Sequence, residues 1–192
     1  TGANAILNLN HDLKAHYHGS AFAGNAFAVY PNGAGQTLNI GAGKTLTMAK
    51  WASFGNTGSS HSTPATNFTL NVNGTLSFEP GRPTGNVTSY GWGNSRTSGN
   101  GYFVLNAGTS NLFTLSVGAT GTVNATEFYP NGTTAAGTPG AGSVSTISVA
   151  TGGVINIDSL ADFRNTAQTI SGAVNIRAGA LVRIANAAGI TV

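Results

Sequence analysis

The residues best suited to contact a ligand gather in one glycine-rich segment of the chain. Residues 79–101, "EPGRPTGNVTSYGWGNSRTSGNG", contain Trp92, Tyr90, Arg82 and Arg96, although charged residues make up only 7% of the chain. Aromatic rings stack on the C–H faces of sugars, and arginines donate charge-assisted hydrogen bonds to carboxylates. The segment therefore predicts a carbohydrate contact. The alternative is that its rings fold back and cover one flank of the domain.

A second group of candidates lies earlier in the chain, in "GKTLTMAKW" (43–51). Two cations and a second tryptophan there would extend the contact surface if the fold brings this stretch beside Trp92. The predicted ligand-binding residues are therefore Trp92, Tyr90, Arg96, Arg82, Trp51, Lys50 and Lys44. The stretch that follows the glycine-rich segment, "YFVLN" (102–106), is predicted to be a strand, with Tyr102 and Phe103 as packing residues.

The acidic residues give little support for catalysis. A calcium-dependent polysaccharide lyase needs a cluster of carboxylates, and a glycoside hydrolase needs two that oppose each other. Glu79 and Glu127 each end a strand-like segment and could form such a pair, but we interpret both as solvated charges at the edges of loops. We predict a protein that is not an enzyme and has no catalytic residues, with a lyase or hydrolase as the alternative. The acidic residues are Asp12, Glu79, Glu127, Asp158 and Asp162.

The sequence predicts neither a metal nor a cofactor. The chain has no cysteine, which excludes disulfides and thiolate metal sites. His16 and His18 alternate and would share one face of a strand, as metal ligands can. Because Asp12 is the one acidic residue near them, we interpret them as part of an exposed N-terminal segment. "GAGKTL" (41–46) lacks the spacing of a phosphate-binding loop.

Charge and composition limit the partners. The chain has 192 residues and a net charge of +3, from 8 basic and 5 acidic residues. The basic residues are scattered, whereas a nucleic-acid-binding domain carries a basic patch, so we expect no nucleic-acid partner. No apolar run is long enough for membrane insertion. We predict a single domain over residues 1–192, excised from a longer exported bacterial surface protein, and the oligomeric state stays open.

A recurrent pattern indicates the elements that must position these residues. In five segments, alternating apolar and polar residues flank a short turn that contains glycine. Alternation with a period of two predicts half-buried strands, and glycine permits a tight corner between them. The apolar anchors Ile40, Val72, Val117, Val149 and Ile176 are separated by 32, 45, 32 and 27 residues.

Such repeats predict an all-β fold, a right-handed parallel β-helix (β-solenoid) with long insertions at 54–67, 79–101 and 129–142. The alternative is an antiparallel β-sandwich, because several Asn-Gly pairs favour hairpins. In the solenoid, asparagines at matching places could stack in ladders between coils or face water. They are Asn39, Asn71, Asn156 and Asn175.

"GAGKTLTM", "NFTLNVNGTLSF", "VATGGVINIDSLADFRN" and "SGAVNIRAGALVRIAN" resemble the pectate lyase-like adhesive domains of Gram-positive surface proteins. Similar modules occur in wall-anchored adhesins of lactic acid bacteria, including the binding regions of serine-rich repeat proteins. The resemblance covers residues 20–192. It implies a right-handed parallel β-helix, an extracellular location at the cell wall, and adhesion to host or plant glycans such as pectin or mucin.

Two further functions are possible for a solenoid without enzymatic activity. A structural or self-associating module is one. An ice-binding solenoid is the other, and it requires threonines in a regular array on a flat face. Thr45, Thr75, Thr122 and the Val154 position do not keep such an array, so we favour ice binding less than glycan binding.

Overall fold

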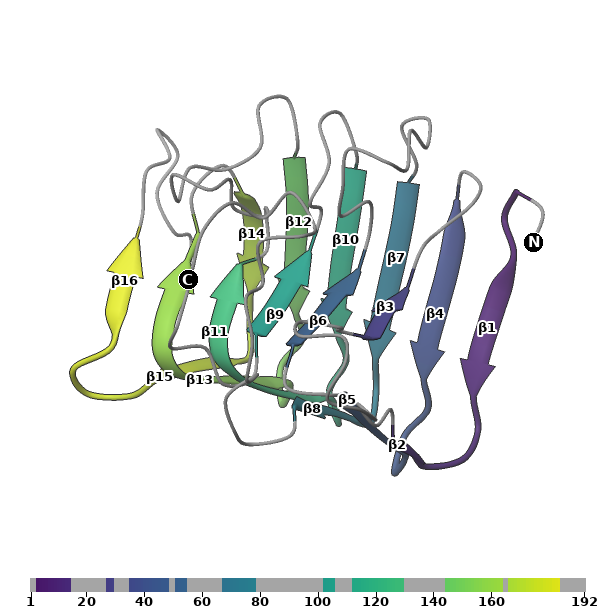
Figure 1. Ribbon diagram of the computed structural model, residues 1–192, viewed down its shortest axis with the longest axis horizontal. Helices are drawn as coiled ribbons and strands as arrows, with labels where there is room; N and C mark the ends of the chain where they lie inside the picture. Colours follow the sequence, from purple (N-terminus) through teal and green to yellow (C-terminus); the bar gives the residue numbers. More distant parts are fainter. Residues whose placement is uncertain are drawn as a thin grey trace, which may run out of the picture.

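The architecture is built from β-strands alone. A computed structural model describes residues 3–14, 27–29, 35–48, 51–54, 67–78, 102–105, 112–129, 144–163 and 166–183. Within these ranges every regular element is a strand, and every pair of neighbouring strands is parallel. Figure 1 shows the strands stacked side by side along the long axis of the molecule.

The strands stack in three rows. The first row is a six-stranded sheet, β1 (Ile6–Leu9), β4 (Gln36–Ile40), β7 (Asn67–Val72), β10 (Leu112–Val117), β12 (Val144–Val149) and β14 (Thr166–Ile170). The second row is β2 (Leu13–Lys14), β5 (Thr45–Met48), β8 (Thr75–Phe78), the first half of β11 (Thr122–Tyr129), the first half of β13 (Val154–Asp162) and β15 (Ala173–Ile176). The third row is β3 (Phe27–Val29), β6 (Trp51–Phe54), β9 (Tyr102–Leu105), the second halves of β11 and β13, and β16 (Leu181–Arg183).

The chain passes through the first, second and third rows in turn, and each such passage forms one coil. β4, β5 and β6 form one coil, and β7, β8 and β9 form the next. In β11 and β13 a single long strand bends from the second row into the third, with a register shift between Ala125 and Glu127. The predicted parallel β-solenoid is confirmed, whereas the β-sandwich alternative is wrong because it requires antiparallel pairs. The right-handed sense stays a prediction.

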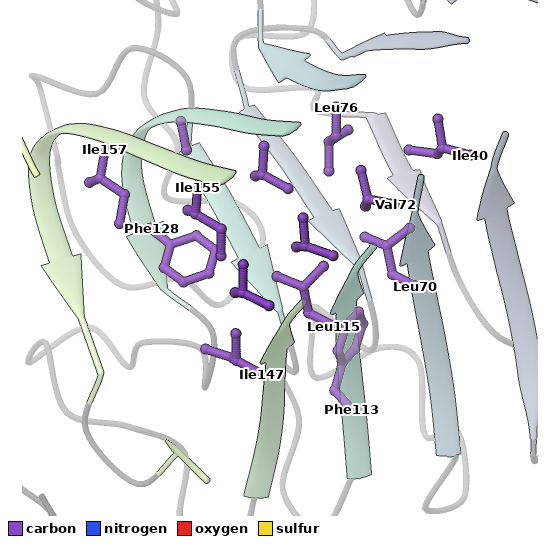
Figure 2. Close-up of a cluster of buried hydrophobic side chains, with 14 of the residues drawn as sticks. Ile40, Leu70, Val72, Leu76, Phe113, Leu115, Phe128, Ile147, Ile155 and Ile157 are labelled. Atoms are coloured by element: carbon purple, nitrogen blue, oxygen red, sulfur yellow. The ribbon is translucent and has the colours of Figure 1, made fainter. Parts of the chain in front are cut away.

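Alternation along each strand separates the core from the outer faces. In β4, Leu38 and Ile40 are buried while Thr37 and Asn39 are partly exposed. Matching apolar residues of successive coils form one continuous core, and Figure 2 shows Ile40, Leu70, Leu115 and Ile147 within it. Phenylalanines of neighbouring coils also meet there. The ring centroids of Phe68 and Phe113 lie 5.1 Å apart, and those of Phe128 and Phe163 lie 5.8 Å apart.

The turns that connect the first row to the second, called corners below, are joined by backbone hydrogen bonds between successive coils, as the strands are. The backbone N–H of Thr75 donates to the carbonyl of Lys44 at 2.8 Å, and that of Thr122 donates to Gly74 at 2.8 Å. A Cβ at Gly74 would overlap the carbonyl oxygens of Gly41 and Lys44 in the preceding corner. Glycine is therefore required at this position by close backbone approach.

The register confirms four of the five predicted anchors and corrects the last. Val72 pairs with Ile40 and with Val117, which in turn pairs with Val149. The fifth position is Ile170 and not Ile176, which pairs with Ile157 in the second row. The prediction was wrong because "VNIRAGALVRI" runs from the second row to the third, where alternation also flanks a glycine turn.

Of the two alternatives for the asparagines, stacking in ladders is the one observed, and it occurs as two separate ladders. In the first row, Asn71 donates to Asn39 at 2.8 Å and Asn39 donates to Asn8 at 2.7 Å. In the second row, Asn175 donates to Asn156 at 2.9 Å, and Asn156 donates to Asn124 at 2.8 Å. All of these bonds join side-chain amides of successive coils, so the amides fix the register from outside the core.

Candidate ligand-binding site

The third row aligns three residues that the sequence separates widely. Trp51 begins β6, Tyr102 begins β9, and the two are register partners. Tyr102 is also the register partner of Glu127 on β11. Neighbouring strands lie about 4.8 Å apart, so these positions form a line across three successive coils.

The β11 member of this line directly precedes a core residue. Phe128 follows Glu127 directly, and its side chain is fully buried in the core (Figure 2). Successive residues of a strand face opposite sides of a sheet, so the position of Glu127 belongs to the outer face. Trp51 and Tyr102 share that register position. Trp51, Tyr102 and Glu127 therefore occupy one register line across three adjacent strands of the third row.

Two carboxylates of the third row are shielded from solvent. Glu127 is 7% exposed and Asp162, on the neighbouring strand β13, is 3% exposed. The interpretation of Glu127 as a solvated charge was therefore wrong. Both carboxylates take part in interactions within the protein. Arg183 on β16 is the register partner of Asp162, which places opposite charges on adjacent strands. Among the described residues, no group of three or more His, Cys, Asp or Glu side chains could hold a metal ion.

The insertion 79–101 precedes Tyr102 in the chain. β8 ends at Phe78 and β9 begins at Tyr102, so the insertion connects the second row to the third in this coil, whereas β11 connects them by a bend in the next coil. The strand β9 that follows the insertion is flanked by the strands of Trp51 and Glu127. The predicted site residues Trp92, Tyr90, Arg96, Arg82 and Lys50 lie outside the described residues.

The structure separates the other two predicted site residues. Trp51 is in the third row, whereas Lys44 is at the corner that precedes β5 in the second row. The strand β5 lies between them, so they are at opposite ends of it. Lys44 is partly exposed, and its carbonyl accepts the hydrogen bond of Thr75. The described structure therefore assigns Lys44 a place in the corner stack, away from Trp51.

Tyr102 begins a strand that the sequence predicts. The predicted strand over "YFVLN" is confirmed as β9. Phe103 is the register partner of the buried Phe128, and Tyr102 is the register partner of Glu127. The packing role expected of Tyr102 and Phe103 stays a prediction.

The N-terminal histidine segment contributes little to the described structure. His11 is exposed, and His16 and His18 lie outside the described residues. Asp12 has a structural contact, because its Oδ1 accepts a hydrogen bond from the backbone N–H of Thr45 at 2.8 Å. In a later corner a backbone carbonyl accepts the equivalent hydrogen bond, as the carbonyl of Lys44 does from Thr75. In the first corner the Asp12 carboxylate is the acceptor instead.

Comparisons with family models, with curated proteins and with solved structures find no match for this chain. No helix able to cross a membrane is present within the described ranges. The interpretation of the site therefore depends on its own residues and their arrangement.

Proposed function

We propose that this chain is a non-catalytic adhesion module that binds polysaccharide at the surface of a bacterial cell. The observation that carries the proposal is the register pairing on adjacent strands of Trp51 with Tyr102, the residue that follows insertion 79–101 in the chain. Aromatic residues in line across successive coils suit a linear polymer that runs along the solenoid. The resemblance to adhesive domains of wall-anchored proteins supports the extracellular location.

An acidic glycan such as pectin or mucin-type material is the ligand class that the charges favour. The insertion contributes Arg82 and Arg96, and Lys50 precedes Trp51 in the chain. Cationic side chains form charge-assisted hydrogen bonds with carboxylates, while rings stack on the sugars. Glu127 is buried, which limits repulsion of an acidic ligand. Each site would bind weakly, and many copies on one cell would supply avidity.

A glycan array tests this proposal directly. The wild-type chain, Trp51→Ala, Tyr102→Ala and Trp92→Ala are compared at neutral and acidic pH, with Thr47→Ala in the second row as the control. Loss of one stacked ring worth about 1.4 kcal/mol lowers affinity about tenfold, so we expect that loss in the ring variants but not in the control. An array without binding by folded protein would contradict the function, and equal binding by all variants would contradict the site.

A glycoside hydrolase is the second candidate. Glu127 and Asp162 are both buried and lie on neighbouring strands, and hydrolases use two carboxylates near each other. Release of reducing ends from pectin by the wild-type chain, lost in Glu127→Gln, would support this function. Absence of turnover by a chain that binds the same glycan would exclude it.

A further inference from the structure

The outer face of the first row carries a regular threonine array. Thr37, Thr69, Thr114 and Thr146 are register partners on β4, β7, β10 and β12. Their side chains are partly exposed, and that of Thr146 is exposed. The sequence interpretation looked for such an array in the second row, where the register does align Thr45, Thr75 and Thr122 but ends at Val154. The array is present in a different row.

A second polar rank runs beside the threonines, two residues further along each strand. It consists of Asn8, Asn39, Asn71, Ser116, Ser148 and Thr169. The three asparagines donate to one another in series, at 2.7 Å and 2.8 Å. Their amides are therefore held at the spacing of the strands. The rank continues with hydroxyl groups, which are also uncharged.

These two ranks form a rigid lattice. Neighbouring strands are about 4.8 Å apart, and residues two apart on a strand are about 6.6 Å apart. Leucine or isoleucine separates the two ranks on each of the four central strands and packs into the core, as Leu70 and Leu115 do at 0% exposure. The backbone of each of these strands is paired on both sides. The side chains are therefore pre-organised, which lowers the entropic cost of binding.

The chemistry of the lattice does not favour the usual macromolecular partners. Its positions on β4, β7, β10 and β12 hold Thr, Asn and Ser, with no charged or aromatic residue. An acidic glycan would need cations there, and stacked sugars would need rings. A protein interface would need large buried anchors such as Trp, Tyr or Arg. An uncharged and periodic array of hydroxyl, methyl and amide groups matches a partner that is itself a neutral periodic solid.

We infer that the outer face of the first row binds ice. Water molecules held between the threonine hydroxyls and the amide rank would be ordered at the two repeat distances of the sheet, and they would join the hydrogen-bonded lattice of ice. This inference is independent of the proposed glycan site, because the first row does not contain Trp51 or Tyr102. It adds a second binding face to the same solenoid.

Thermal hysteresis and inhibition of ice recrystallisation, measured on the full chain, test the inference. We expect both activities in the wild type and the loss of most of each in Thr114→Lys and Thr146→Lys, whose long cations disrupt the lattice. Thr47→Lys is the matched control, because Thr47 is a partly exposed outward threonine of the second row, in register with Ser77. Circular dichroism melting curves verify that each variant is folded, and the exposed Thr146 is the position that best tolerates lysine.

The outcomes separate this inference from the glycan proposal. A folded wild-type chain without either ice activity would overturn the inference, whatever the glycan array shows. Equal loss in Thr47→Lys would also overturn it, because the activity would not depend on the first row. Loss of ice activity in Thr114→Lys with unchanged glycan binding would support two independent faces.

Discussion

Asn39 accepts a hydrogen bond from Asn71 at 2.8 Å and donates one to Asn8 at 2.7 Å. One side chain thus links three successive coils of the first row. Because each amide uses its donor toward one coil and its acceptor toward the other, the ladder has a direction. The middle residue contributes to two bonds, while Asn8 and Asn71 contribute to one each within the ladder.

Asn39→Ala should therefore destabilise the protein by about 1–2 kcal/mol, since a typical hydrogen bond contributes about 1 kcal/mol net. Urea unfolding followed by circular dichroism measures the change. Ser116→Ala, at the same register position outside the amide series, is the control and should change the free energy of unfolding by less than about 0.5 kcal/mol. Equal effects of the two substitutions would contradict a structural role for the ladder.

Gly74→Ala should be more damaging than alanine substitution of Gly43 in the preceding corner. The added Cβ overlaps the carbonyl oxygens of Gly41 and Lys44, which are backbone atoms of a hydrogen-bonded corner and cannot rotate away. We expect a loss of about 3 kcal/mol or more, at the upper end of overpacking effects. The measurement is the midpoint of urea unfolding.

Gly43→Ala is the matched control for that substitution. Gly43 has a φ of +69° but no atom within 4 Å of its added Cβ. Its cost should come from backbone strain alone, about 1 kcal/mol. A larger cost at Gly43 than at Gly74 would mean that strain, and not close stacking, determines the corner sequence.

The repeat pattern was sufficient to predict the first two rows and most of their register. Alternation with a glycine turn identifies each first-row strand and the second-row strand that follows it, and it matched Asn39 with Asn71 correctly. The same pattern occurs where the chain passes from the first row to the second and where it passes from the second to the third. Ile176 lies in the second row but was aligned with the anchors of the first. Counting residues cannot resolve this, because insertions make the coils unequal in length.

The third row was harder to predict, and the candidate site depends on it. The chain enters this row after the insertion in one coil and through a bend near Ala125 in the next. The alignment of Trp51 with Tyr102 therefore depends on pairing between strands that are distant in sequence. The threonine array was missed for a related reason, since register decides which threonines stack.

Removal of the Asp12 carboxylate should loosen the first corner locally. Its Oδ1 accepts the backbone N–H of Thr45 at 2.8 Å at an exposed site. Asp12→Ala should accelerate hydrogen exchange of the Thr45 amide and leave exchange of Thr75 unchanged, because Thr75 donates to the carbonyl of Lys44. Amide exchange measured by NMR checks both residues. Equal acceleration at both amides would indicate a global loss of stability instead.

Gln168→Leu should stabilise the protein. Gln168 is the register partner of Ile147, in a core position that leucine holds in three earlier coils, Leu38, Leu70 and Leu115. Its Oε1 is buried without a hydrogen-bond partner, while its Nε2 donates to the hydroxyl of Thr166 at 2.6 Å. That hydroxyl keeps its own bond to the carbonyl of Phe163 at 2.8 Å when the amide is removed.

An unsatisfied buried acceptor costs about 1–3 kcal/mol, so its replacement by leucine should recover about 1 kcal/mol after the loss of the bond to Thr166. In a domain of this size, 1 kcal/mol raises the melting temperature by about 2–4 °C. Differential scanning calorimetry measures that shift. Gln168→Glu is the control and should lower the melting temperature, because it buries a charge at the same position. A lower melting temperature for Gln168→Leu would mean that the amide stabilises the last coil through its bond to Thr166.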